Sequence, residues 1–97
     1  MKHQDLDPKT HEIITILSEE AAEVIREVSK TIRFGLDDRR KNLLEGEIGD
    51  LLAMIDLLQS QGVVTAAGLE LAKQAKIDRK STRLTPVTSL SRMPSSA

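Results

Sequence analysis

The stretch at residues 42–59, NLLEGEIGDLLAMIDLLQ, constrains the fold more than any other part of the chain. It contains no proline, and its apolar residues recur at the spacing of a helix that buries one face. At ~100° per residue, Glu47 lies in the middle of that apolar face, and Asp50 lies one turn later at its border. An unpaired carboxylate in a protein core is strongly unfavourable, so both positions require a cation, a proton or a metal ion.

Helix start and stop signals predict three helices. Asp7 before Pro8 is a favourable N-cap, and Gly35 follows the first long run as a terminating glycine. The second helix is predicted to begin at Asn42, and Thr65 is predicted to cap a third helix, AAGLELAKQAKIDRK. No segment alternates strictly between apolar and polar residues. The predicted fold class is therefore all-α, a bundle of about three helices per chain.

Length and composition predict one small globular domain. The chain has 97 residues, 39% apolar and 30% charged, and a domain of this size is often completed by oligomerisation. We place the helical domain at residues 1–81 and a flexible Ser/Thr/Pro tail at 82–97, which is either filler or an interaction tail. The sequence has no cysteine, no run as long as a membrane span and no signal-peptide pattern. These features favour a cytosolic protein without a membrane partner.

The first predicted helix carries a second group of carboxylates. One apolar face comprises Leu17, Ala21, Val24, Ile25, Val28 and Ile32, with a stripe formed by Glu20, Glu23 and Glu27 along its edge. Glutamates at such spacing are usually a solvated face, and that interpretation holds for EEAAE taken alone. If two antiparallel helices pack their apolar faces together, however, Glu20 and Glu23 converge with Glu47 and Asp50. We find no lysine or arginine on the inner faces of these two helices, so the pattern predicts a divalent cation, Mg²⁺ or Mn²⁺.

The sequence resembles a known family in its acidic segments. EEAAE at 19–23 and EIGD at 47–50 are similar to the EExxE and ExxD motifs of the MazG-like all-α nucleotide pyrophosphohydrolases. SKTIRFGLD at 29–37 and LLEGEIGDLLAMIDLL at 43–58 resemble small bacterial and phage members. The resemblance extends over about residues 13 to 80 of the chain.

This resemblance implies an enzyme that hydrolyses a nucleoside triphosphate to the monophosphate and pyrophosphate. It implies a homodimer or a dimer of dimers, and Glu20, Glu23, Glu47 and Asp50 as the catalytic metal ligands for Mg²⁺ or Mn²⁺. Glu19 points away from the other carboxylates on the helical wheel, and its expected role is a second ion or the attacking water. Phage-type relatives favour a purine substrate such as dGTP or GTP, and the expected setting is dNTP-pool control in a bacterial or phage-infected cytosol.

The third predicted helix carries the candidate phosphate contacts. Lys73, Lys76 and Arg79 supply cations that the β and γ phosphates of a triphosphate need. An ordinary solvated basic helix end is an equally good interpretation. Relatives often carry an asparagine in this helix, where the present chain has Gln74. This difference bears on the predicted substrate contacts more than on the predicted metal ligands.

Two other classes of function compete with an enzyme. One is a non-catalytic dimeric helical adaptor whose acidic face binds a basic partner. The other is a small nucleic-acid-binding module that uses the basic third helix. The net charge of −1 and the single aromatic residue, Phe34, argue against nucleic acid as a partner.

Overall fold

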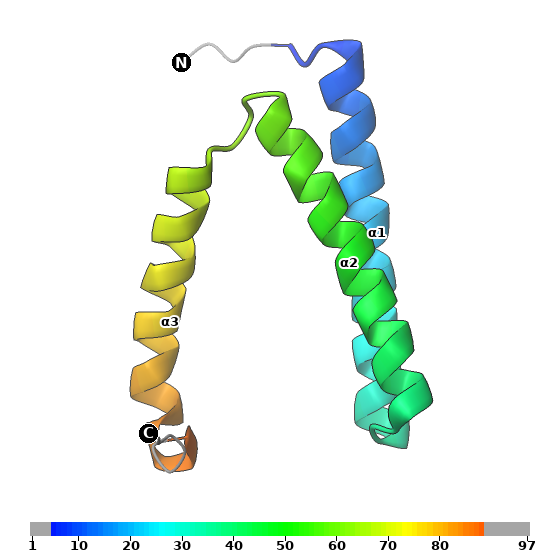
Figure 1. Ribbon diagram of the computed structural model, residues 1–97, viewed down its shortest axis with the longest axis vertical. Helices are drawn as coiled ribbons and strands as arrows, with labels where there is room; N and C mark the ends of the chain where they lie inside the picture. The colour runs from blue at the N-terminus through cyan, green and yellow to red at the C-terminus, as the bar shows by residue number, and fades with distance from the viewer. Residues whose placement is uncertain (1–4, 89–97) are drawn as a thin grey trace. The chain divides into compact units, whose positions relative to one another are not determined.

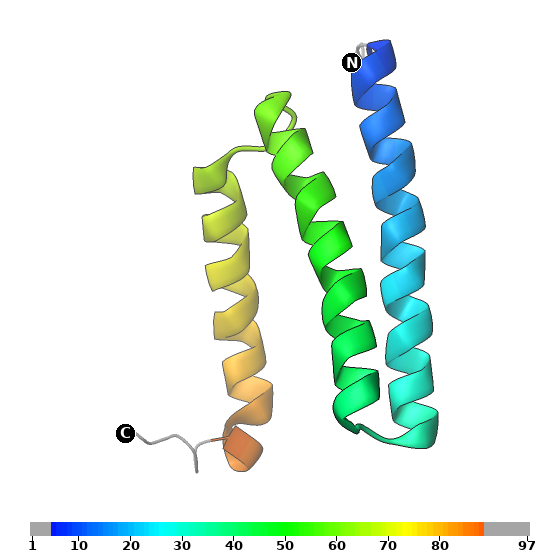
Figure 2. The same cartoon turned by 45° about the vertical axis from the view of Figure 1, so that its right-hand side comes forward.

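The structure, a computed structural model, describes the backbone of residues 5–88 and the side chains of residues 5–79. It contains three helices, α1 (Pro8–Phe34), α2 (Asp38–Ser60) and α3 (Ala66–Thr88) (Figure 1). No strand occurs within residues 5–88, and the all-α prediction is confirmed. α1 and α2 form an antiparallel hairpin, which both ribbon views show (Figure 1 and Figure 2). α3 belongs to a second compact unit that begins at Val64.

The predicted caps of α1 and α3 are confirmed. Asp7 Oδ1 accepts a hydrogen bond from the Thr10 N–H at 2.8 Å, and Pro8 occupies the first turn, where its missing N–H has no cost. Gly35 ends α1 at φ +91°, a value that favours glycine, and its N–H donates to the Thr31 carbonyl. At the start of α3, Thr65 Oγ1 accepts a hydrogen bond from the Gly68 N–H at 2.9 Å.

The predicted start of α2 is wrong. Its N-cap is Asp37, whose Oδ1 accepts a hydrogen bond from the Arg40 N–H at 2.7 Å, whereas Asn42 lies inside the helix. Aspartate caps a helix as well as asparagine does, and residues 38–41 contain no glycine or proline to prevent another helical turn. The longer helix therefore gains a turn of backbone hydrogen bonds. It also makes Arg40 a helical residue of α2.

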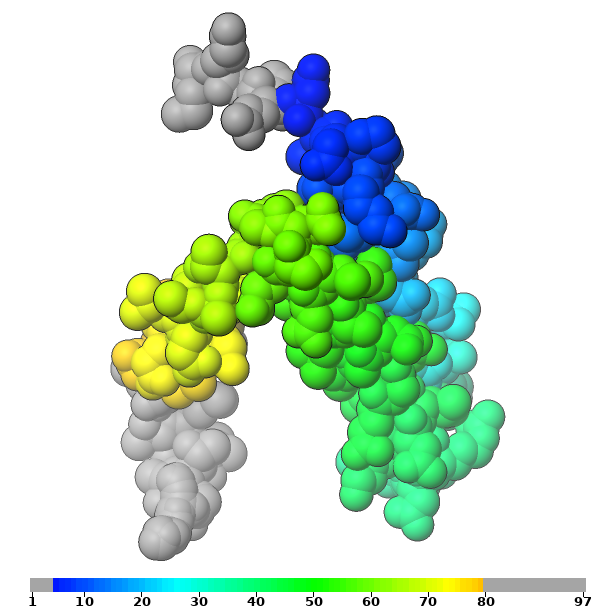
Figure 3. Space-filling view, turned by 45° about the horizontal axis from the view of Figure 1, so that its top comes forward, coloured from blue at the N-terminus to red at the C-terminus, as the bar shows by residue number. Residues whose placement is uncertain are grey.

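α1 and α2 pack along a seam with alternating spacings of three and four residues. The space-filling view shows α2 in contact with α1, and the turn after α2 lies beside the beginning of α1 (Figure 3). We define the seam as the buried and half-buried positions that follow this spacing, namely Thr10, Ile13, Leu17, Glu20, Val24, Glu27 and Thr31 of α1 and Arg40, Leu44, Glu47, Leu51, Met54 and Leu58 of α2. Ile13 and Leu58 are its most buried apolar side chains. The seam is thus an aliphatic contact with charged residues inserted at regular intervals.

The face of α1 that packs on α2 differs from the predicted apolar face. Leu17 and Val24 lie in the seam, but Ile25 and Ile32 are 66% and 80% exposed. On a helical wheel, the centre of the seam lies roughly 60° from the centre of the predicted apolar stripe. α1 is rotated toward its glutamate edge, and this rotation directs Glu20 and Glu27 at α2.

The second unit contains α3, whose side chains up to residue 79 are exposed except for the half-buried Leu69. The helical backbone continues to Thr88, past residue 82, the predicted beginning of the tail. Serine and threonine are only mildly unfavourable in a helix, so composition alone does not end α3. Residues 89–97 of the predicted tail lie outside the described residues. Within the described range, no helix has a sufficiently long and apolar segment to span a bilayer.

Two alanine substitutions test the start of α2. Asp37→Ala removes the side-chain acceptor for the Arg40 N–H and is expected to lower the free energy of unfolding by about 1 kcal/mol. Asn42→Ala replaces an exposed residue inside the helix with a better helix former and is expected to leave stability unchanged or raise it by up to about 0.5 kcal/mol. Urea unfolding followed by circular dichroism measures both. A larger loss of unfolding free energy in Asn42→Ala than in Asp37→Ala would show that Asn42 is the N-cap, as the sequence predicts.

Candidate metal centre

Three carboxylates converge where α1 faces α2. Glu20 comes from α1, and Glu47 and Asp50 come from α2, where a spacing of three residues places both on one side of the helix. Each offers one carboxylate oxygen, and these three oxygens all lie within 4.8 Å of one another. Glu20 and Glu47 are half-buried in the seam, and Asp50 is exposed at its border. The structure therefore joins the two acidic segments that the sequence singled out.

The electrostatics of the cluster centre on Glu20. Partial loss of hydration is the largest cause that raises the pKa of Glu20 above its ordinary value, followed by the negative charges of Asp50 and then Glu47. Among the ion pairs of the described residues, none involves Glu20, Glu47 or Asp50. Among residues 5–79, the cluster thus holds like charges close together without a protein cation paired to them.

The fourth predicted ligand, Glu23, lies outside the three-carboxylate cluster. Its Oε1 accepts a hydrogen bond from Arg26 Nη2 at 2.6 Å, in a partly exposed ion pair on the surface of α1. Its negative charge nevertheless contributes to the raised pKa of Glu20, as does that of Glu19. Glu19 is exposed and absent from the cluster, in agreement with its direction on the helical wheel.

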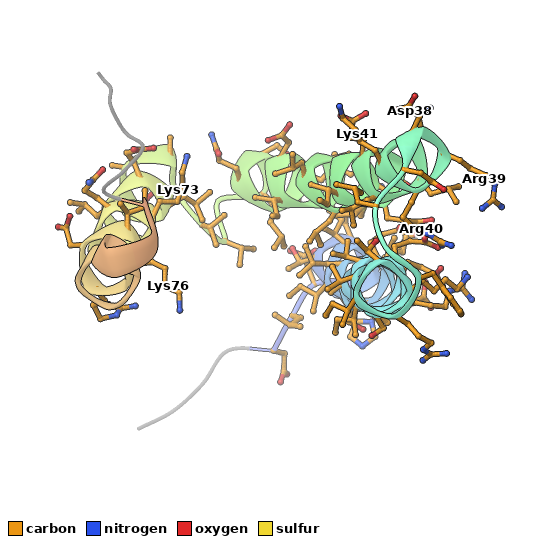
Figure 4. The ribbon with its side chains drawn as sticks, turned by 90° about the horizontal axis from the view of Figure 1, so that it is seen from below. Asp38, Arg39, Arg40, Lys41, Lys73 and Lys76 are labelled. Carbon is orange, nitrogen blue, oxygen red and sulfur yellow. The ribbon has the colours of Figure 1, made fainter. Side chains whose placement is uncertain are left out.

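The three predicted phosphate contacts lie on α3. Lys73, Lys76 and Arg79 are exposed, and Lys73 Nζ lies 3.3 Å from Glu70 Oε1. Lys73 and Lys76 extend from the helix (Figure 4) and line a surface pocket of about 410 Å³ together with Leu69, Ala72 and Ile77. Because α3 belongs to the second unit, a role of these cations toward a phosphate bound at the carboxylates stays a prediction.

Sequence reasoning missed one charged pair in the seam. Glu27 is 5% exposed, and its Oε1 lies 3.5 Å from Nη1 of Arg40, whose side chain is 14% exposed. The inference that no arginine lies on the inner faces of the two helices is therefore wrong. It followed from starting α2 at Asn42, which left Arg40 in a loop. The signal was the seven-residue spacing, because Glu27 follows Glu20 by seven and Arg40 precedes Glu47 by seven.

The three carboxylates fit a divalent cation. All offered atoms are oxygens, which suits hard ions such as Mg²⁺ and Mn²⁺ and does not suit ions that prefer sulfur or imidazole. The clustered negative charge supplies the electrostatic reason: the pKa of Glu20 is raised first by loss of hydration and then by the charges of Asp50 and Glu47, and a dication would offset that repulsion. Exposed acidic groups also occur without a metal, but here two of the three groups are half-buried between packed helices.

Comparison with known proteins identifies a family. The family model of the MazG nucleotide pyrophosphohydrolase domain matches residues 9–84, which is more than half of the chain. The matched range includes all three carboxylates of the cluster and the cations of α3. No curated protein and no solved structure matched the chain.

Neutralising the central carboxylate tests the electrostatic description of the cluster. In EDTA, Glu20→Gln removes one of three converging charges, so we expect the variant to unfold at a higher temperature than the wild-type chain. The same variant is expected to bind Mn²⁺ more weakly, because it loses a ligand. Glu12→Gln, on the exposed surface of α1, is the control and should change neither property. A lower unfolding temperature for Glu20→Gln than for the wild-type chain would show that another group already neutralises the Glu20 charge, and would contradict this description.

The raised pKa of Glu20 also predicts a pH dependence of metal binding. A metal ion requires the ionised carboxylate, so protons compete with it as the pH falls through the pKa of Glu20. Because that pKa is raised, the apparent Mn²⁺ affinity should begin to fall at a higher pH than an ordinary glutamate would cause. Titration calorimetry over a pH series measures this onset. An onset at or below the ordinary glutamate range would contradict the description.

Proposed function

Because the chain belongs to the MazG nucleotide pyrophosphohydrolase family, we propose that it hydrolyses a nucleoside triphosphate to the nucleoside monophosphate and pyrophosphate. The observation that carries this proposal is the convergence of Glu20, Glu47 and Asp50, whose oxygens lie within 4.8 Å of one another. A triphosphate is itself highly negative, so a site built from carboxylates requires a cation between protein and substrate. That requirement links the acidic cluster to the family's chemistry.

The proposed cofactor is Mg²⁺ or Mn²⁺, held by Glu20, Glu47 and Asp50. We assign Glu23 as the fourth ligand, since it lies one turn after Glu20 and its charge is felt there. Its present partner is Arg26, at 2.6 Å in a partly exposed pair. Such surface pairs contribute little stability, so breaking the pair with Arg26 would cost little free energy when Glu23 binds a dication.

The reaction breaks the bond between the α-phosphorus and the oxygen that bridges it to the β-phosphorus. The oxygen of a water molecule bonds to the α-phosphorus, and pyrophosphate leaves with the bridging oxygen. A dication held by Glu20, Glu47 and Asp50 would supply the positive charge that stabilises the phosphoryl oxygens during such a displacement. Among the chain's own residues, the exposed Glu19 is the candidate to orient the water and accept its proton, while the clustered carboxylates fix the position of the reacting group.

The substrate contacts are proposed from charge and from the family resemblance. Lys73, Lys76 and Arg79 of α3 are assigned to the β and γ phosphates, where exposed cations form charge-assisted hydrogen bonds. The proposed substrate class is a purine triphosphate such as dGTP or GTP, in the cytosol of a bacterium or of a phage-infected host. The purine assignment rests on the resemblance to phage-type relatives alone.

Self-association is part of the proposal. Ile25 and Ile32 of α1 and Leu52 of α2 are each more than half exposed. Around each helix axis, these positions are offset from the seam in the direction of increasing residue number. Because the two helices are antiparallel, the same offset places all three on one side of the hairpin. An exposed apolar stripe of this kind supports a homodimer or a dimer of dimers, because oligomerisation would cover it.

One assay tests the bond that is cleaved and the role of the cluster. The chain is incubated with a panel of NTPs and dNTPs plus Mg²⁺ or Mn²⁺, and nucleotide products are separated by ion-exchange chromatography. Monophosphate with pyrophosphate is expected. Glu47→Gln should lose this activity by two or more orders of magnitude while keeping its helical circular dichroism, because it removes a proposed ligand.

Glu45→Gln is the matched control, since Glu45 is exposed on the same helix two residues earlier. It should retain wild-type activity. Diphosphate with inorganic phosphate would contradict the proposed bond. Hydrolysis that survives Glu47→Gln would remove the cluster from the mechanism, and no hydrolysis of any triphosphate would favour the adaptor interpretation.

A further inference from the structure

A charged pair is buried between α1 and α2 near the closed end of the hairpin. Glu27 of α1 is 5% exposed, and the side chain of Arg40 of α2 is 14% exposed. Arg40 points toward α1, whereas the neighbouring Asp38, Arg39 and Lys41 point away from it (Figure 4). Arg40 therefore differs from the other cations at the start of α2, which are solvated.

This pair is a poor source of stability. Arg40 Nη1 and Glu27 Oε1 are 3.5 Å apart, and this oxygen accepts no hydrogen bond within the described part of the chain. Removing two charges from water is expensive, and an apolar pair of similar volume is often as stable or more stable. Buried ion pairs of this kind are best attested as devices that select one packing arrangement.

α1 has a competing way to pack. Its exposed side carries Ile25, Val28 and Ile32, which would bury more apolar surface than the glutamate edge does. Turning α1 by roughly 60° would bring that stripe toward α2. The same rotation would carry Glu20 and Glu27 out of the seam. Burial of apolar area alone thus favours a hairpin in which the carboxylate cluster does not form.

The pair acts on the same helix faces as the cluster. Glu27 follows Glu20 by seven residues on α1, and Arg40 precedes Glu47 by seven on α2, so each pair of positions lies two turns apart. A rotation that separates Glu27 from Arg40 separates Glu20 from Glu47 as well. Further contacts hold the pair in place: Lys30 Nζ lies 3.8 Å from Glu27 Oε2, and the Arg40 guanidinium lies 5.9 Å from the Phe34 ring centre.

We propose that Glu27 and Arg40 are positioning residues that fix the rotation of α1 against α2 and so direct Glu20 at Glu47 and Asp50. The expected effect of this pair on metal binding rests on the proposed function, whereas its effect on the rotation of α1 does not. Neither residue touches the reacting atoms. Their effect is transmitted through the helices, two turns along the same seam.

Mn²⁺ affinity is the first readout. Glu27→Lys places two cations together and is expected to raise the Mn²⁺ dissociation constant by about 10–100-fold, the range typical of supporting residues around metal ligands. Adding Arg40→Glu restores opposite charges in reversed order and should return most of that affinity. Glu12→Lys is the matched control, because Glu12 forms an exposed pair with Lys9 on the same helix at 3.8 Å. It should leave the affinity unchanged.

The rotation is measured directly by thiol labelling, since the chain contains no cysteine. Glu20→Cys and Ile25→Cys are made separately, without metal, in the otherwise wild-type chain, in Glu27→Lys and in Glu27→Lys/Arg40→Glu. Labelling is done at a protein concentration at which sedimentation shows monomers, because self-association would cover position 25. In the wild-type monomer, position 25 should react faster than position 20. In Glu27→Lys this order should reverse, and the charge-swapped pair should restore it. If Glu27→Lys does not give a helical circular dichroism spectrum, Glu27→Gln is used for both readouts.

The outcomes separate this inference from the proposed function. If the labelling order reverses and is restored but the wild-type chain binds no Mn²⁺, the positioning role stands and the metal site fails. If the chain binds Mn²⁺ and hydrolyses triphosphates but labelling is the same in all backgrounds, the positioning role is overturned. A loss of Mn²⁺ affinity in Glu27→Lys that the charge swap does not restore also overturns it.

Discussion

α1 packs on α2 through a seam that contains charges, and this packing positions the candidate site. Aliphatic residues supply the contact, but Glu20, Glu27, Arg40 and Glu47 occupy positions that apolar residues would normally fill. Each charged residue lies where the helical repeat directs it at the partner helix. The candidate site is consequently part of the packing of the hairpin, rather than a group added to a finished surface.

The two halves of this seam solve the problem of buried charge differently. Near the closed end, Glu27 has Arg40 within 3.5 Å, so opposite charges offset one another. Two turns away, Glu20 faces Glu47 and Asp50, and its pKa is raised first by loss of hydration and then by the charges of these neighbours. A chain that keeps such a cluster gives up stability at that point, as functional sites commonly do. A dication is the simple partner that turns the same arrangement from repulsive to favourable.

Several features could be predicted from the sequence because they depend on local chemistry. The caps formed by Asp7 and Thr65 and the glycine stop at Gly35 follow from residue type and spacing. The placement of Glu47 and Asp50 on one side of the second helix follows from spacing as well. The rotation of α1 could not be predicted, since it results from a competition between apolar area and a specific ion pair. That pair includes Arg40, which is a helical residue only because α2 begins after Asp37 and not at Asn42. The pairing of Glu23 with Arg26 fits their i, i+3 spacing, but spacing alone does not decide whether the Glu23 carboxylate turns to Arg26 or to the cluster.

The central claim is that the rotation of this hairpin builds a divalent metal centre from three carboxylates. Its most direct test is anomalous diffraction at the manganese edge from crystals grown with Mn²⁺. In the wild-type chain we expect an anomalous peak for a manganese ion bound by carboxylate oxygens of Glu20, Glu47 and Asp50. Crystals that bind manganese only elsewhere, or that show these three side chains turned away from one another, would contradict it.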